Sequence, residues 1–345
     1  MMSNANTSNI PVAETRIAKK MPSSVIGIDI RRVTVSSRSL SVPSSSSSEP
    51  PSVATAVLSS TRMFPMLRAM TAEVPKIAPS LVDEVFAQTA RFFALPEAAK
   101  APLSILKSPH NRGWAAEGAE ALDPASGQAD RKEAFNIGLD LAADDPRVAA
   151  GEPFRGVNLW PDQPGFRAAM LHYYDAVLAL GVDLHRAFAR DLGLPEDWFA
   201  PRFSAPMATL RLLSYPPAKG TPGEIGAGAH TDYGSVTLLA TDGAPGLQIR
   251  PRGGGWTDVA HVPGAFVVNI GDCLMRWTND TYVSTPHRVL PPERARRSVA
   301  FFLDPDPDAC IAPLPGTGVP KYPPVTGADY LRGRLAATYG AEGPA

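Results

Sequence analysis

The chain contains 345 residues, of which 44% are hydrophobic, and its formal net charge is −1. A chain of this size and apolar content can form one or two domains with a sizeable core, but its near-neutral charge would attract neither nucleic acid nor an anionic membrane. Because the sequence has no run of about 18 apolar residues, we also predict no membrane-spanning helix.

Residues 1–60 differ in composition from the rest of the chain, being rich in Ser, Thr and Pro and poor in acidic and aromatic residues. Such a segment buries too little apolar surface to offset the entropy lost on ordering, so we predict a low-complexity or disordered N-terminal segment. Only Ser23–Ile30 has the pattern of a strand. The excess of Arg and Lys also resembles an organellar transit peptide, and a gene-model error is a third interpretation.

Cys273 and Cys310 are the only cysteines in the sequence. Two cysteines in a chain of this length favour reduced thiols in a reducing compartment over a disulfide framework. We therefore expect a cytoplasmic protein, with import into an organelle as the alternative that the basic N-terminal segment offers.

Helices are predicted where apolar residues recur every three or four positions. The first runs from Ser80, its predicted N-cap, to about Leu95, and a short helix follows from Pro96. The longest periodic segment, Pro164–Leu192, predicts a helix of about 25 residues with a wide apolar stripe. A final helix is expected over 326–339.

From about Met207 the apolar pattern changes to the alternation that is typical of strands. Asp130–Leu139 has a similar pattern further upstream. Short strands separated by Pro- and Gly-rich turns are typical of a sandwich or barrel. The predicted strands are Thr209–Tyr215, Ser235–Thr241, Leu247–Arg250, Phe266–Ile270, Val283–Leu290 and Ser298–Leu303.

His230 and Asp232 stand two positions apart, just before an apolar, β-branched run. On a strand, residues two apart point to the same face, so we expect the imidazole and the carboxylate to reach one point. Two histidines and one carboxylate make the facial triad of non-haem Fe(II) oxygenases. His261, near a turn, and His287, entering a strand, are the candidates for the third ligand. His287 is the better candidate because the strand that follows fixes its direction.

The remaining histidines have weaker claims to a chemical role. His172 and His185 belong to the long helix, where we expect structural positions, and His110 lies in a turn from which it could line a pocket.

Arg296 and Ser298 are two apart on a predicted strand and therefore share one face. A guanidinium can bind a carboxylate through two parallel hydrogen bonds, and a hydroxyl can add a third. Tyr215, on the strand that precedes His230, could contribute a phenol donor. These residues form a candidate anchor for a dicarboxylate.

His230-Thr231-Asp232, His287 more than fifty residues later, and Arg296-Arg297-Ser298 followed by Phe301-Phe302 resemble the isopenicillin N synthase-like family of Fe(II)/2-oxoglutarate dioxygenases. The resemblance covers roughly residues 77–335. It implies a mainly β fold with flanking helices, around a distorted double-stranded β-helix or jelly-roll core. It also implies iron ligation by His230, Asp232 and His287, and binding of 2-oxoglutarate by Arg296, Ser298 and Tyr215.

By this resemblance the protein is an enzyme that uses Fe(II), 2-oxoglutarate and dioxygen, and we expect it to be a monomer. It would couple oxidative decarboxylation of 2-oxoglutarate to hydroxylation, desaturation or ring closure of a small molecule. No catalytic residue beyond the metal ligands is required. One alternative is an ethylene- and succinate-forming enzyme or an isopenicillin N synthase-like oxidase. A second alternative is an inactive jelly-roll binding module.

Four regions are expected along the chain. Residues 1–60 are the N-terminal segment, 61–205 a helical and extended region that flanks the barrel, 206–310 the jelly-roll domain, and 311–345 a C-terminal tail and helix. Nothing between Arg32 and Lys76 resembles the helix and second strand with which family members begin. We therefore hypothesise a frame error or a wrongly assigned exon in residues 32–76.

Overall fold

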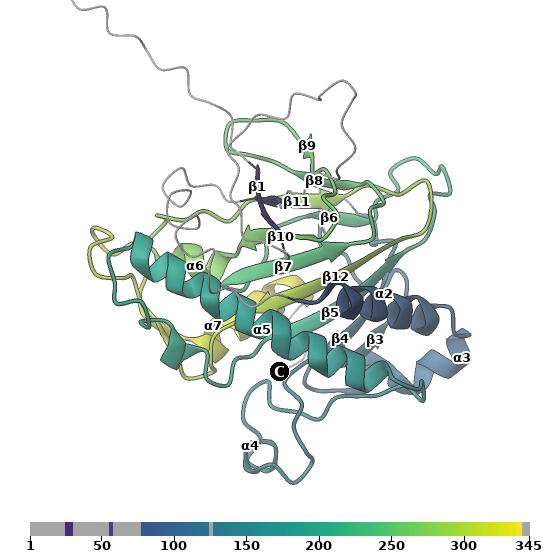
Figure 1. Cartoon of the computed structure of the whole chain (residues 1–345), viewed down its shortest axis with the longest axis horizontal. Coiled ribbons are helices and arrows are strands. Elements are labelled where there is room, and N and C mark those ends of the chain that lie inside the picture. The colour runs from purple at the N-terminus through teal and green to yellow at the C-terminus, as the bar shows by residue number, and fades with distance from the viewer. Residues whose placement is uncertain (1–24, 30–54, 58–76, 124–126, 340–345) are drawn as a thin grey trace, which may run out of the picture.

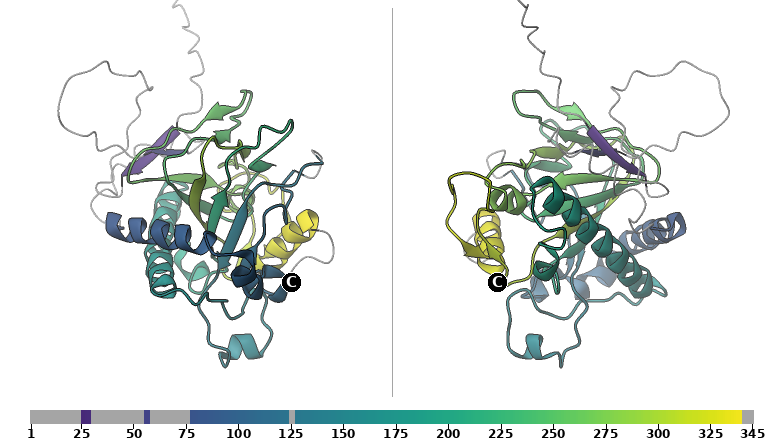
Figure 2. Two further views of the ribbon diagram at one scale, coloured as in Figure 1. Left: turned by 90° about the vertical axis from the view of Figure 1, so that its right-hand side faces the viewer. Right: turned by 60° about the vertical axis from the view of Figure 1, so that its left-hand side comes forward.

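Two antiparallel β-sheets and a layer of helices make up the computed structural model, which describes residues 25–29, 55–57, 77–123 and 127–339. Helices pack on one face of the large sheet and the small sheet lies against its other face (Figures 1 and 2). The large sheet has the spatial order β2 (Thr55–Val57), β1 (Val25–Asp29), β10 (Ala265–Ile270), β7 (Val236–Thr241), β12 (Arg296–Leu303), β5 (Thr209–Tyr215), β4 (Glu133–Ile137) and β3 (Gly113–Ala115). The small sheet has the order β6 (Ala227–His230), β11 (His287–Val289), β8 (Leu247–Ile249) and β9 (Thr257–Asp258).

The alternation along β12 explains why the large sheet has two different faces. Val299, Phe301 and Leu303 are fully buried in the core on the helix side. Ser298, Ala300 and Phe302, which alternate with them in sequence, line a cavity on the side of the small sheet. Because successive side chains of a strand point to opposite faces, the same strand packs the core and furnishes the cavity wall.

The helix side of the large sheet is covered by α2 (Pro79–Phe93) and α5 (Phe166–Asp191). Phe92 of α2 and Phe166 of α5 meet Phe135 of β4, with ring centroids 4.6 and 5.6 Å from the Phe135 ring. Buried aromatic side chains in edge-to-face contact contribute both apolar area and specific geometry. This cluster holds the two helices and the sheet together.

Shorter elements connect these layers. They are α3 (Glu97–Lys100), α4 (Pro146–Ala149), α6 (Asp272–Trp277), α7 (Gly327–Tyr339), the 3₁₀ turns η1 (Ala101–Leu103), η2 (Ile105–Lys107) and η4 (Ala200–Arg202), and the strand pair β13 (Cys310–Ile311) and β14 (Val325–Thr326). Leu331 and Leu335 of helix α7 line the cavity between the sheets.

The predicted mainly β fold with flanking helices and a jelly-roll core is confirmed, and most predicted elements are present within one or two residues. The prediction that Ser80 caps α2 is wrong. The helix begins at Pro79 after Ala78, because proline has no N–H to satisfy and suits the first helical position. Only His287–Val289 of the predicted strand Val283–Leu290 is a strand. Strand β6 and helix α6 were not predicted as separate elements.

Within the N-terminal segment, the predicted strand Ser23–Ile30 corresponds to β1, which pairs with β10 through Ile28 and Phe266. Strand β2 lies in the stretch 32–76, where we expected no family-like element, and pairs with β1. The rest of residues 1–76, including the predicted disorder and the transit-peptide interpretation, lies outside the described residues.

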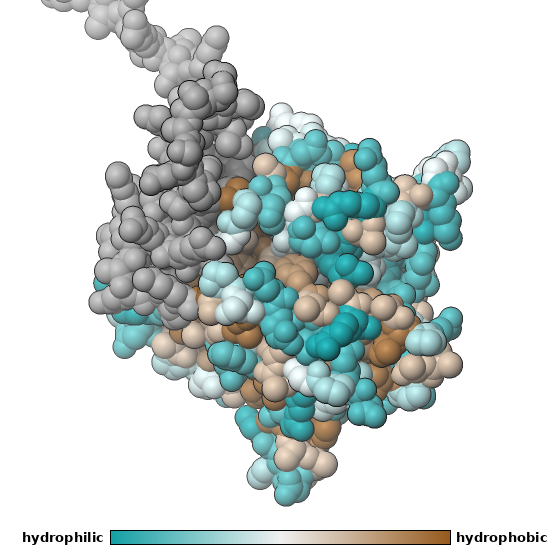
Figure 3. All heavy atoms as spheres, turned by 45° about the vertical axis from the view of Figure 1, so that its right-hand side comes forward, coloured by the Kyte–Doolittle hydropathy of each residue, from teal (hydrophilic) through white to brown (hydrophobic). Residues whose placement is uncertain are grey.

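Hydrophilic and hydrophobic residues are interspersed on the face of the molecule in Figure 3. The large hydrophobic side chains with the greatest exposure, Leu106, Val157 and Val319, belong to three separate segments, and single exposed apolar residues are ordinary on protein surfaces. Among the described helices, none is long and apolar enough to cross a membrane.

Candidate active site

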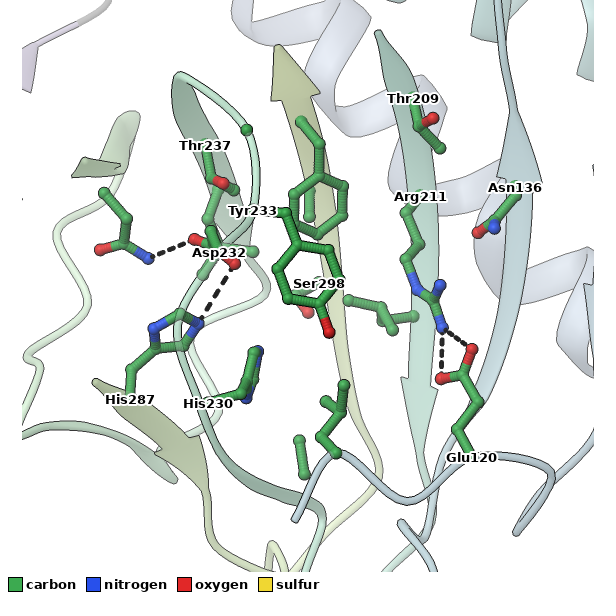
Figure 4. Close-up of a pocket in the computed structure, with 18 of the residues that line it drawn as sticks. Glu120, Asn136, Thr209, Arg211, His230, Asp232, Tyr233, Thr237, His287 and Ser298 are labelled. Carbon is green, nitrogen blue, oxygen red and sulfur yellow. Dashed lines mark hydrogen bonds and ion pairs between the residues drawn. The ribbon is translucent and has the colours of Figure 1, made fainter. Parts of the chain in front are cut away.

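A cavity of about 170 Å³ lies between the two sheets. Figure 4 shows its side chains in two groups, with His230, Asp232 and His287 on one side and Arg211, Glu120 and Asn136 on the other. The two groups belong to different elements, since the histidines come from the small sheet and the second group from β4, β5 and a preceding loop. The sheets therefore hold chemically distinct walls opposite one another.

The three predicted metal ligands converge at one wall of the cavity. His230 ends β6, His287 begins β11, and the two are register partners, with ring centroids 4.3 Å apart. The Nε2 atom of His287 lies 3.5 Å from Oδ1 of Asp232. One ligand atom from each residue lies within 4.8 Å of the others, so all three can reach a single ion.

The expectation that His230 and Asp232 share one strand is wrong. Strand β6 ends at His230, and Asp232 lies in the loop that leads to β7. This loop is held by the first turn of α6, where the N–H of Asp272 donates to the carbonyl of Asp232 over 2.8 Å. The side-chain amide of Asn269 also donates to Oδ2 of Asp232. Asp232 is therefore aimed by α6 and β10 rather than by strand periodicity.

The close approach of α6 depends on a glycine at its N-cap. A Cβ at Gly271 would overlap the carbonyl oxygen of Gly234. Gly234 belongs to the loop 231–235 between β6 and β7, called the metal loop below because it contains Asp232. Any larger residue at position 271 would push α6 away from the loop. The sequence Asn269-Ile270-Gly271-Asp272 therefore supports the site, although its role could not be assigned from sequence alone.

Backbone carbonyls set the form of both imidazoles. Nδ1 of His230 lies 2.7 Å from the carbonyl oxygen of Gly228, and Nδ1 of His287 lies 3.2 Å from that of Thr285. A carbonyl only accepts hydrogen bonds, so each Nδ1 carries a proton, which leaves Nε2 as the atom of each ring that can ligate a metal. Burial, with a smaller contribution from His287, also holds the pKa of His230 well below its ordinary value. The donor set of two imidazoles and one carboxylate fits Fe(II).

Arg296 forms the opposite end of the predicted site. It is only 1% exposed, its guanidinium lies over the ring of Tyr215 at 4.9 Å, and its Nη1 donates to Oγ of Ser298 over 3.3 Å. No carboxylate of the described residues forms an ion pair with it, and its Nε has no hydrogen-bond partner. A buried guanidinium without a counter-charge is costly, and a bound carboxylate would compensate it.

The other histidines lie apart from this wall. His261 shares a hydrogen bond with Thr241 near the surface and does not line the cavity. His172 is exposed, whereas His185 is buried and bonded to the carbonyl of Gly181 and to Ser235. His110 does not line the cavity either, although its neighbours Asn111 and Arg112 do.

Several cavity residues were not predicted. Arg211 and Glu120 form an ion pair on the wall that faces the metal ligands, and Leu331 and Leu335 of α7 add apolar surface. Asp304 also lines the cavity, where burial, reinforced by the charge of Asp232, raises its pKa to about 7. Of these residues, only Arg211 could have been suggested from sequence, because the alternation along β5 puts it on the same face as Tyr215.

Comparison with known proteins identifies the class. The family model of the 2OG-Fe(II) oxygenase superfamily matches residues 206–305, and that of the non-haem dioxygenase N-terminal domain, described for morphine synthesis, matches residues 41–163. The chain is 37% identical over 278 residues to the 2-oxoglutarate-Fe(II) type oxidoreductase hxnY of Emericella nidulans. The aligned region covers 77% of this chain and 79% of the relative. The chain therefore belongs to the 2OG-Fe(II) oxygenase superfamily.

Two further relatives differ in what they act on or bind. The proline hydroxylase buaE of Petromyces alliaceus is 35% identical, over 76% of this chain and 87% of its own. The crystal structure of Neurospora crassa T7H with alpha-KG and thymine is 36% identical, covers 76% of this chain and 85% of its own, and has a TM-score of 0.68. Membership thus confirms an Fe(II)- and 2-oxoglutarate-dependent dioxygenase, and neither alternative function is favoured.

The N-terminal match begins at residue 41, inside the stretch 32–76 that we could not relate to the family. Part of that stretch therefore aligns with family members. The frame-error hypothesis for it remains a prediction.

Proposed function

We propose that His230, Asp232 and His287 hold the catalytic Fe(II) of this dioxygenase. The observation that carries the assignment is the convergence of their three ligand atoms within 4.8 Å on the cavity wall. When bound there, iron supplies the oxidising chemistry that joins dioxygen activation to decarboxylation of 2-oxoglutarate. The carbonyl bonds at Nδ1 of both histidines keep Nε2 available as a ligand atom.

Arg296, Ser298 and Tyr215 bind the far carboxylate of 2-oxoglutarate in this proposal. The guanidinium balances the carboxylate charge, and the Ser298 hydroxyl adds a hydrogen bond on the same face of β12. Leu213 and Val289 provide apolar surface in the cavity, which keeps water away from the co-substrate. These residues orient 2-oxoglutarate toward the metal wall.

The prime substrate is a small molecule that enters the same cavity; the crystal structure of the N. crassa relative, which contains alpha-KG and thymine, supports a small-molecule substrate. A chain with a net charge of −1 offers no general attraction for nucleic acid, so we propose a free small molecule as the substrate. We also propose that the enzyme acts as a monomer. The described free cysteines, Cys273 and Cys310, support a cytoplasmic location. Residues 206–310 form the catalytic jelly-roll domain, which agrees with the family match at 206–305.

The test is made on the full chain, loaded with Fe(II) without oxygen and then exposed to oxygen with 2-oxoglutarate. We expect one iron per chain and a slow release of succinate that requires iron, oxygen and 2-oxoglutarate. A protein that binds neither iron nor 2-oxoglutarate would overturn the assignment.

A further inference from the structure

We propose that the cavity wall opposite the metal ligands is a subsite for an uncharged amide edge, so that the prime substrate is a lactam, cyclic imide or cyclic urea with adjacent N–H and C=O groups. Asn136, Arg211 and Glu120 carry this inference. It rests on the proposed function, because the subsite matters for the reaction only if the opposite wall holds iron.

Asn136 and Arg211 are register partners on neighbouring strands. Asn136 of β4 lies directly across from Arg211 of β5, and Arg211 lies across from Ala300 of β12. Ala300 in turn lies across from Leu239 of β7. All four residues line the cavity. Figure 4 shows Arg211 and Asn136 on the side away from His230. A flat molecule held by the first two residues would lie over apolar Ala300 and Leu239 and extend toward the metal ligands.

The charges of one cluster on this wall, formed by Arg211, Glu120, Lys132 and Asp130, are already balanced. Nη2 of Arg211 donates to both carboxylate oxygens of Glu120, over 2.6 and 2.5 Å. Lys132 lies 3.1 Å from Glu120 and also forms an ion pair with Asp130. Burial opposes ionisation of Glu120, yet its basic neighbours Arg211 and Lys132 lower its pKa to about 2. Two basic and two acidic groups therefore neutralise one another.

This balance disfavours a charged substrate group beside Arg211 and Glu120. A substrate carboxylate would compete with Glu120 for Arg211, and an ammonium group would compete with Arg211 and Lys132 for Glu120. Arg112 lies at the same end, where its Nη1 and Nη2 donate to the carbonyls of His110 and Phe154 while its Nε has no hydrogen-bond partner among the described residues. An uncharged ligand leaves all of these pairs intact.

One buried acceptor on the wall has no partner. Asn136 is 1% exposed, and its Nδ2 donates to the carbonyl of Asn111 over 3.3 Å, which fixes the carboxamide so that Oδ1 is the acceptor on the other side. Oδ1 has no hydrogen-bond partner among the described residues. Buried polar atoms are nearly always paired with protein, water or ligand. A ligand N–H is the complement of this oxygen.

The neighbouring group defines the rest of the edge. A guanidinium donates hydrogen bonds and accepts none, so the substrate atom beside Arg211 must be an acceptor. Directly opposed side chains of paired strands have Cβ atoms roughly 4.5–5.5 Å apart, which suits a donor and an acceptor on adjacent ring atoms. An N–H next to a C=O is that arrangement.

The decisive experiment uses the full chain with Fe(II) and 2-oxoglutarate, and measures succinate release above the substrate-free rate. Thymine and 2-pyrrolidinone are the N–H amide probes, 1,3-dimethylthymine is the matched ring without N–H, and proline is the charged comparison. We expect stimulation by the N–H amides only. Equal stimulation by 1,3-dimethylthymine, stimulation by proline, or no response to either amide with normal substrate-free turnover would each overturn the proposal. Loss of iron binding and of substrate-free turnover would instead overturn the proposed function.

Asn136→Leu removes the acceptor at similar size and should raise KM for the stimulating amide roughly tenfold, the effect of one lost hydrogen bond. The Kd for 2-oxoglutarate and the iron content should stay unchanged, which a general packing defect would not allow. Ile137→Val, on the other face of β4, is the matched packing control. An unchanged KM in Asn136→Leu would mean that Oδ1 serves a buried water only and would refute the subsite. The wild-type probe series remains decisive if this variant fails to fold.

Discussion

Arg334 of α7 forms a 2.7 Å ion pair with Asp272, the first residue of α6. The same Asp272 oxygen accepts a hydrogen bond from the hydroxyl of Thr231, and the Arg334 guanidinium lies over the ring of Tyr233 at 4.7 Å. Thr231 and Tyr233 flank the metal-ligand candidate Asp232. The C-terminal helix is therefore fastened to the loop that presents this carboxylate.

Arg334→Met should weaken iron binding while it changes stability little. The pair is partly exposed, and pairs of this kind contribute about 0.2–1 kcal/mol to the free energy of unfolding. Losing it frees α7 from the metal loop, so we expect a higher Kd for Fe(II) with a small change in Tm. Arg332→Met is the matched control, since Arg332 pairs with exposed Asp329 on the same helix. Equal iron affinities in the two variants would contradict this role.

Replacing any one of His230, Asp232 and His287 by Ala should abolish iron-dependent succinate release, because two remaining ligands hold Fe(II) poorly. Iron content after desalting and succinate formation are the measurements. His261→Ala is the control, since this histidine bonds Thr241 outside the cavity and should leave both values unchanged. Substantial turnover in any of the three variants would refute the ligand assignment.

The relation between His230 and His287 shows what local sequence can predict. A strand beginning at His287 was enough to prefer it to His261, and the structure pairs it with His230. Asp232 was placed near His230 for the wrong reason, because its direction depends on α6 and Asn269, more than 35 residues away in sequence.

The juxtaposition of Asn136 and Arg211 on one wall could not be predicted from local sequence. Strands β4 and β5 were each expected, but which residues face one another depends on pairing across more than 70 residues. Glu120, in an irregular segment, has no periodicity to indicate that it reaches Arg211. Local patterns thus identified the strands and the candidate metal ligands, and long-range register determined the wall opposite them.

Arg296→Ala should weaken 2-oxoglutarate binding by roughly 2–5 kcal/mol, the range for losing one partner of a buried charge pair. Arg296 is buried on the cavity face of β12, whereas Arg297 is its half-buried neighbour on the opposite face. Arg297→Ala therefore serves as a matched charge control and should leave the Kd for 2-oxoglutarate nearly unchanged. Calorimetric titration of each variant, loaded with Mn²⁺ in place of iron, measures this. An unaltered affinity in Arg296→Ala would count against the anchor.

His185 should make the free energy of unfolding fall as the pH is lowered from about 6.5 to about 4. Burial lowers the pKa of His185 to about 4, because its ring is enclosed by Phe188, Phe199 and Phe203 and bonded to Ser235. The unfolded chain, with an ordinary histidine pKa of about 6.5, binds a proton in this window that the folded chain does not. The neutral His185 ring contributes fully to the free energy of unfolding above pH 6.5. As the pH falls below 6.5 this contribution decreases, and the loss reaches about 3 kcal/mol at pH 4.

Urea unfolding of the wild type and of His185→Asn at pH 7, 6 and 5 measures this slope. The variant starts less stable, because it loses ring packing in the core, but it should lose less stability than the wild type between pH 7 and pH 5. His172→Gln, an exposed position on the same helix, should keep the wild-type slope. Parallel slopes in the wild type and His185→Asn would show that other groups, and not His185, control acid sensitivity in this range.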